Sequence, residues 1–300
     1  MKKKTYLFAL MAMALTLGSC SDNENGIGGE TSKYITVSTS IGNMTRVATD
    51  EKGGQTFEEG DEISVYAWTG APTVAPETSE RVVNNAINKL TNGSWVSTPQ
   101  MLWKNNREKH YFIGVYPTAA ISDLSAGEYT FDVNKQTESD LLVAVNPDGL
   151  SYSADAQQTV PLTFTHVMAK LAVNLTYKNQ WGGIPTVEKV VVGNAAKEAT
   201  INYLTKVVTP STTAKEDFSL PEITENTKYV SVIIPQEDVK QLTIVIGGKN
   251  FVYDNGTPFK LESGKITTVN LEVGRDEIKL GDVKITNWED GSTFSGEAIN

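Results

Sequence analysis

Three side chains have the chemistry of a nucleophile, a general base or a soft metal ligand: Cys20, His110 and His166. A catalytic nucleophile needs a base beside it and an acid that orients the base, and no spacing here predicts such a set. A zinc site needs three or four ligands, which two separated histidines and one cysteine near the N-terminus do not supply. The acidic run Glu58–Glu62 lacks the spacing of a calcium loop. The sequence therefore predicts no catalytic residue, no metal site and no cofactor.

Cys20 follows a segment with the features of an export leader. Residues 2–4 are lysines, and the apolar run Tyr6–Leu17 is too short to span a bilayer. The sequence Leu17-Gly18-Ser19-Cys20 resembles the lipobox of bacterial lipoproteins, in which the cysteine is acylated, for example with palmitate. We therefore predict a signal peptide over 1–19, a lipidated Cys20 and a flexible tether over 20–32.

The acidic residues directly after Cys20 also resemble the signal that sends some lipoproteins to the outer face of the outer membrane. We therefore expect a surface-exposed protein of the cell outer membrane. The formal net charge of −10 argues against a nucleic-acid partner, because phosphate binding needs clustered lysine and arginine.

Arg46 is a candidate for proteolysis. A trypsin-like protease cleaves after a basic residue, and a polar run over 47–55 follows this arginine, so the Arg46–Val47 bond is a predicted cleavage point. The alternative is an ordinary exposed arginine at the end of a strand.

The segment before Arg46 has the period of a half-buried β-strand. One face carries Ile35, Val37, Thr39 and Ile41, and the other carries Thr36, Ser38 and Ser40. We predict that the segment 33–46 is a removable first strand. Its loss would take a row of hydrogen bonds from a sheet and leave an open edge that another strand can fill.

The rest of the sequence predicts an all-β protein with little helix. Short β-rich runs alternate with Gly, Pro, Asn and Asp, which is typical of sandwiches and barrels. The segment Arg81–Leu90 is ambiguous, because its apolar residues have helical spacing while Asn92-Gly93 follows as a hairpin turn; we predict a strand. A polar stretch over 151–160 suggests a boundary, which gives two β-sandwich domains over 33–158 and 159–300.

The five tryptophans leave an alternative function open. Aromatic side chains on a sandwich surface can stack on sugars, although they more often fill a core. We expect Trp68 and Trp288 in the core and Trp181, beside Gly182-Gly183, as the most exposed. The alternative is thus a monomeric surface lipoprotein that binds glycans.

Four segments together resemble one protein family. They are Phe57–Ala67 (FEEGDEISVYA), Phe164–Leu171 (FTHVMAKL), Leu261–Lys265 (LESGK) with Asn270-Leu271, and Ile285–Trp288 (ITNW). The residues of these segments and their order along the chain resemble the motifs of the fimbrillin pilins, the type V pilus subunits of anaerobic gut and oral Gram-negative bacteria.

The resemblance implies two transthyretin-like β-sandwich domains and a non-enzymatic role in a fimbrium. It implies a lipoprotein precursor that a trypsin-like protease cuts after an arginine, at the position of Thr45-Arg46 here. The first strand then leaves, and a strand from another pilin subunit takes its place. The segment that ends at Asn300 is the candidate donor strand, and an adhesive role at the pilus tip is a further option.

Overall fold

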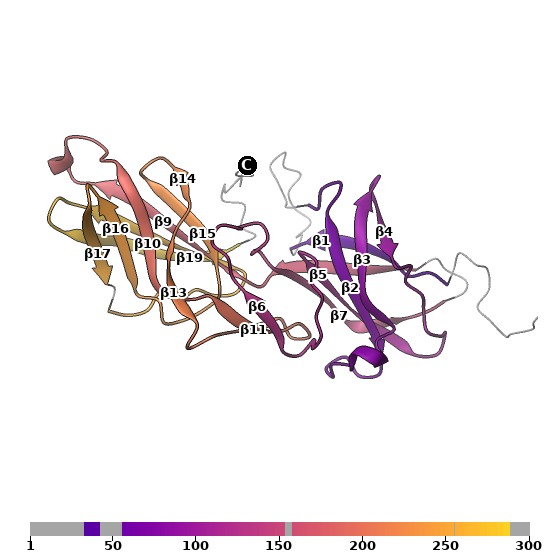
Figure 1. Ribbon diagram of the computed structural model, residues 1–300. Helices are drawn as coiled ribbons and strands as arrows, with labels where there is room; N and C mark the ends of the chain where they lie inside the picture. Colours follow the sequence, from indigo (N-terminus) through magenta and orange to yellow (C-terminus); the bar gives the residue numbers. More distant parts are fainter. Residues whose placement is uncertain (1–32, 43–55, 154–157, 255, 289–300) are drawn as a thin grey trace, which may run out of the picture.

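The computed structural model describes residues 33–42, 56–153, 158–254 and 256–288. Within these residues nearly all regular structure is β-strand, and the helical turns are two short 3₁₀ helices, η1 (Thr78–Glu80) and η2 (Asn179–Trp181). The molecule is elongated, and the first and second halves of the chain lie end to end along its long axis (Figure 1). The predicted all-β class is confirmed.

The first half forms one seven-stranded sheet. In spatial order its strands are β1 (Thr36–Ile41), β8 (Thr159–His166), β7 (Leu142–Ser151), β5 (Lys109–Tyr116), β2 (Glu62–Thr69), β3 (Val83–Thr91) and β4 (Ser94–Thr98). The sheet curls on itself, because the residues just before β1 bond to the segment that follows β4. Ile35 N donates to Met101 O at 3.0 Å, and Trp103 N donates to Lys33 O at 3.2 Å.

The ambiguous segment Arg81–Leu90 contains most of β3, so the predicted strand is confirmed. Asn92 and Gly93 both have positive φ, at 52° and 72°, and they connect β3 to β4 with Thr91 opposite Ser94. Two consecutive positive φ values are the requirement of a type I′ hairpin turn, which an Asn-Gly pair meets at little cost. Local turn chemistry therefore prevailed over the helical spacing.

The second half is a sandwich of two sheets. One sheet contains β14 (Glu222–Thr224), β15 (Lys228–Ile233), β9 (Ala169–Tyr177), β18 (Lys265–Val273) and β19 (Ile278–Asn287), in that order. The other contains β13 (Lys215–Ser219), β10 (Val187–Ala196), β16 (Gln241–Ile246) and β17 (Lys249–Asp254). Alternate residues of the two sheets, such as Leu171, Val269, Val190 and Ile244, are fully buried between them.

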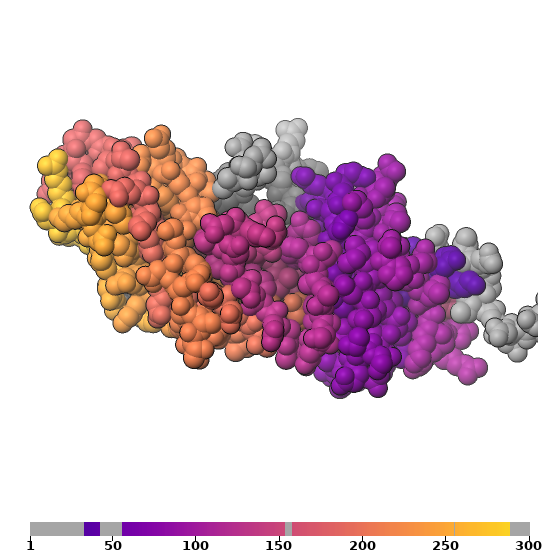
Figure 2. Space-filling model, viewed as in Figure 1, coloured from indigo at the N-terminus to yellow at the C-terminus, as the bar shows by residue number. Residues whose placement is uncertain are grey.

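A small third sheet joins the halves. It contains β12 (Val207–Pro210), β11 (Glu198–Asn202) and β6 (Gly127–Thr130), so a strand of the first half pairs with strands of the second. The side chain of Gln136 adds a second link, because it bonds to Ser231 Oγ at 3.0 Å and to Val232 N at 2.7 Å. Figure 2 shows the magenta residues of this region between the purple first half and the orange second half.

The boundary predicted between residues 158 and 159 does not coincide with the division between sheets. β8 lies after that boundary, but it pairs with β1 and β7 of the first sheet. The side chains of Val160, Leu162 and Phe164 are buried in the core of the first half. The strand that contains them therefore belongs to the first sheet and does not begin a second domain. The change of sheet falls at the buried pair Val167-Met168, between β8 and β9.

Two hydrophobic cores result, and the first sheet faces both. One face of β2, with Ile63, Val65 and Ala67, lies in the core enclosed by the curled sheet. The other face, with Tyr66 and Trp68, belongs to the larger core that continues into the second half. The inward side chains of β1 contact the enclosed core only, so β1 is packed independently of the second half.

Candidate functional site

β1 is held as an integral strand and is not loose on the surface. It pairs in parallel with β8, from Thr36 opposite Thr159 to Ile41 opposite Phe164. Ile35 and Val37 are 1% and 6% exposed, Thr39 and Ile41 are half-buried, and Ser38 on the other face is exposed. The predicted half-buried strand is confirmed, and its N-terminal end is buried more deeply than its C-terminal end.

Hydrogen bonds hold β1 along the side that faces β8, while on the other side the backbone bonds with Met101 and Trp103 involve Lys33 and Ile35, just before β1. At its C-terminal end Gly42 N donates to Phe164 O at 2.8 Å. On the outward face the hydroxyls of Thr36 and Thr159 lie 3.1 Å apart, and Ser40 donates to Thr163 at 3.2 Å. On the opposite side lies the segment Met101–Trp103, described above. An extended chain in this position therefore has partners for its backbone and for its outward hydroxyls.

An aromatic cluster lies under the second half of β1. The ring of Phe57 makes edge contacts with Trp95, Tyr116 and Phe164, with ring centroids 5.1 to 5.4 Å apart. Trp95 Nε1 donates a hydrogen bond of 3.0 Å to Thr39 Oγ1. We refer to β8, Met101–Trp103, Phe57 and Trp95 together as the β1 site.

Removal of β1 would expose the edge of β8. β7 pairs with β8 only from Phe164 to His166, whereas β1 pairs with β8 from Thr159 to Phe164. The first half of β8 therefore has β1 as its strand partner among the described residues. An unpaired edge above a row of apolar pockets is a template for strand addition.

Other predicted site residues are not described by the structure. Cys20, Arg46 and Val47 lie outside the described residues, so lipidation and cleavage stay predictions.

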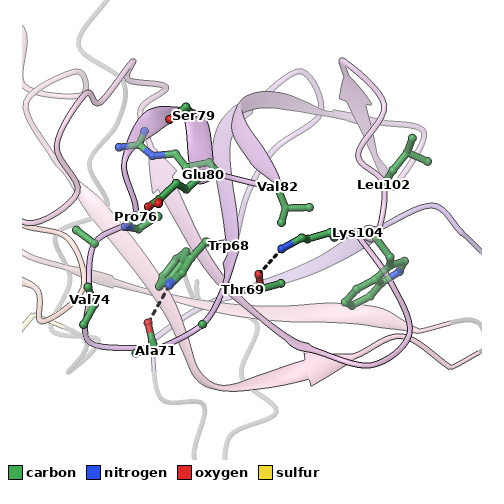
Figure 3. A pocket seen from close by; sticks show the side chains of 14 residues that line it. Trp68, Thr69, Ala71, Val74, Pro76, Ser79, Glu80, Val82, Leu102 and Lys104 are labelled. Carbon is green, nitrogen blue, oxygen red and sulfur yellow. Dashed lines mark hydrogen bonds between the residues drawn. The ribbon is translucent and has the colours of Figure 1, made fainter.

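An open depression of about 800 Å³ lies at one end of the first sheet. Figure 3 shows two hydrogen bonds at its wall, from Trp68 to Ala71 O at 2.9 Å and from Lys104 to Thr69 at 3.1 Å. Its two tryptophans, Trp68 and Trp103, are only 2% and 5% exposed, so their ring faces are not open to a sugar. The depression thus offers no aromatic platform for the glycan-binding alternative.

Trp181, expected to be the most exposed tryptophan, is one of the two described tryptophans that are not buried. It is half-buried, its Nε1 donates to Val273 O at 3.0 Å, and its ring contacts Phe251 at 5.9 Å. A tryptophan held in this way contributes to the sandwich edge of the second half, with Arg275 lying over its ring.

His110 lies beside the depression as a buried neutral imidazole. Its Nε2 accepts a hydrogen bond of 3.1 Å from Lys104 N, and its ring meets the edge of Trp103 at 5.0 Å. Burial lowers the pKa of His110, because a charged imidazolium would lose its hydration there.

We expect His110→Gln to change how stability depends on pH. The unfolded chain protonates this imidazole near pH 6.5, whereas the folded protein does so only at lower pH. The unfolded state then binds more protons, so the free energy of unfolding falls on acidification below that pH, by at most about 1.4 kcal/mol per pH unit. Glutamine keeps an acceptor for Lys104 N but does not titrate. Urea denaturation between about pH 7 and pH 5 checks this, and equal pH slopes in both proteins would contradict it.

His166 packs at the end of β8 in a cluster that includes the last described residue. Its ring stacks on Trp288 with centroids 4.1 Å apart and planes 7° apart, while its Nδ1 lies 2.8 Å from Asp140 Oδ1. Lys170 Nζ lies 4.2 Å from the centroid of the same indole, and burial lowers the pKa of Lys170. His166 therefore has a packing and hydrogen-bonding role in its strand. The end of β19 is thereby attached to the junction of the two halves.

The described residues contain no group of three or more His, Cys, Asp or Glu side chains arranged to hold a metal ion. No helix among them has the length and apolar character needed to cross a membrane.

Sequence reasoning missed the residues that receive β1. The alternation of Val160, Leu162 and Phe164 predicts that β8 is a half-buried strand, but it does not predict which strand pairs with β8. Trp95 carries no such signal, because its contact with Thr39 arises only when the sheet curls.

Comparison with known proteins identifies the family. The family model described as fimbrillin-like matches residues 45–288, and β1 precedes the match. A Bacteroides ovatus protein described as a candidate for cell adhesion has a TM-score of 0.62 at 18% identity, over 85% of this chain and 98% of that one. A similar candidate from Bacteroides uniformis gives 0.61 at 20% identity, over 78% and 93%. A fimbrial protein from Bacteroides vulgatus gives 0.51 at 13% identity, over 84% and 99%.

These structural likenesses show a shared fold, and no curated protein matches the sequence. The family match, in contrast, covers most of the chain and includes every described strand from β2 to β19. The protein therefore belongs to the fimbrillin-like family.

Proposed function

We propose that this protein is the precursor of a pilus subunit that assembles by strand exchange. Lipidation of Cys20 attaches the precursor to the outer membrane at the cell surface. A trypsin-like protease then cuts between Arg46 and Val47, β1 leaves, and a strand from a neighbouring subunit fills the β1 site. Membership of the fimbrillin-like family supports the role of fimbrial subunit.

The observation that carries the proposal is the pairing of β1. This short strand is the partner of the first half of β8 among the described residues. Ile35 and Val37 fill pockets of the enclosed core, and each such side chain contributes about 1.5–3 kcal/mol when buried. A replacement strand that restores these contacts and the backbone hydrogen bonds would be held tightly.

The candidate donor remains the segment that ends at Asn300; its residues 289–300 lie outside the described residues, and β19 (Ile278–Asn287) is the described strand that leads into it. β19 is the edge strand of its sheet and pairs with β18. Leu280, Val283 and Ile285 are 37–38% exposed, which is unusual for aliphatic residues of a strand that faces a sandwich. Its exposed aliphatic side chains are of the type that the apolar positions of the β1 site receive.

We expect limited trypsin treatment of the purified precursor to give a new N-terminus at Val47. The cut protein should then form multimers, because the fragment that contains β1 is no longer tethered and its place can be taken. N-terminal sequencing and size-exclusion chromatography measure the two steps.

Arg46→Ala combined with Lys52→Ala is the matched control, because trypsin also cleaves after lysine; this variant should keep the first strand attached and the protein monomeric. Cleavage elsewhere with Arg46 intact, or cut protein that stays monomeric with every partner subunit offered, would refute the proposed function.

A further inference from the structure

The four inward positions over residues 35–41, which are Ile35 and three residues of β1, do not all have the same chemistry. Ile35 and Val37 are buried members of the enclosed hydrophobic core, and Ile41 is partly buried and packs against the same core. Thr39 lies between them in sequence and is the exception, because its side chain carries a hydroxyl into an otherwise apolar row.

The hydroxyl of Thr39 has a specific partner. Trp95 Nε1 donates to Thr39 Oγ1 at 3.0 Å, across the closure of the curled sheet between β1 and β4. The indole nitrogen is only a donor, so the group that meets it must be an acceptor. The edge contact with Phe57, at 5.3 Å, fixes the Trp95 ring in the half-buried position from which it reaches β1.

An occupant with an aliphatic side chain at this position would leave the indole N–H without its acceptor in a partly buried place. Leaving a buried donor without an acceptor costs more free energy than the hydrogen bond itself contributes. The outward positions add a weaker preference, since Thr159 and Thr163 each bond a hydroxyl of β1.

We propose that Trp95 selects the strand that enters the β1 site. The occupant is an extended strand of a neighbouring subunit with aliphatic side chains at the positions of Ile35, Val37 and Ile41. At the position of Thr39 it carries a short oxygen acceptor, such as Thr, Ser, Asn or Asp. This inference rests on the proposed strand exchange and adds the chemistry by which the site distinguishes one strand from another.

The test uses the full chain cut with trypsin, after which the protease is inhibited. Fluorescent peptides with the sequence of residues 33–42 are added, carrying Thr39, Thr39→Ser or Thr39→Val, and their binding is measured by fluorescence anisotropy. Valine has nearly the shape of threonine and a higher apolar content, so packing alone favours it. We expect the Thr and Ser peptides to bind similarly and the Val peptide about five- to tenfold more weakly.

A Trp95→Phe protein serves as the matched control, because phenylalanine keeps an aromatic ring beside Phe57 and removes the donor. In this protein the difference between the Thr and Val peptides should disappear. Equal binding of Thr and Val peptides to the unchanged protein overturns the selection by Trp95, as does a difference that persists in Trp95→Phe. Failure of every peptide to enter the site instead overturns the proposed strand exchange.

Discussion

Ile35→Ala is expected to lower the free energy of unfolding by about 3 kcal/mol. The side chain is 1% exposed and lies in the core enclosed by the first sheet, so the substitution leaves a cavity in that core. Chemical denaturation of the purified full chain measures the loss. Because the larger core does not include Ile35, spectroscopic probes in the second half should report little change before unfolding.

Ser38→Ala is the matched control for this substitution. Ser38 lies on the same strand, but its side chain is exposed on the outward face, so the expected change is within about 0.5 kcal/mol. Equal effects of the two substitutions would mean that β1 contributes no packing to the core, and the proposed exchange would then have no energetic basis.

Trp288→Ala is expected to have a comparable effect at the other end of the chain, about 3 kcal/mol. The indole is 7% exposed, stacks on His166 and lies under the ammonium group of Lys170. Its backbone N–H also donates to Gly264 O at 3.0 Å, so the residue attaches the end of β19 to the turn that precedes β18. Hydrogen exchange of the β19 amides should become faster, because the strand loses its terminal contact.

Leu280→Ala provides the comparison for Trp288→Ala. Leu280 belongs to β19 but is 37% exposed, so truncating it should cost well under half as much. If β19 exchanges equally fast in both variants and in the unchanged protein, Trp288 does not control the attachment of this strand.

Local patterns in the sequence predicted the strands well, because their causes are local. The alternation Ile35-Thr36-Val37-Ser38 fixes which side chains face a core, and Asn92-Gly93 fixes a turn. Both signals are complete within ten residues. The all-β class follows from the repetition of such signals along the chain.

The partners of the strands could not be predicted in the same way. Ser40 meets Thr163, which is 123 residues away in the sequence, in a parallel pairing that no turn dictates. The same limitation explains the misplaced boundary, since the polar stretch before β8 resembled a linker while β8 itself completes the first sheet. Thr39 and Trp95, 56 residues apart, come together only because the sheet closes.

The pairing of β6 with β11 has a mechanical consequence. With β8 and β9 separated only by the buried residues Val167 and Met168, and with a strand of the first half built into a sheet of the second, the described residues contain no hinge between the halves. Each subunit should therefore resist bending between its two halves and behave as a stiff rod. We expect a fibre of such rods to bend at the joints between subunits; under the proposed strand exchange, its resistance to shear would depend on the strand that crosses each joint.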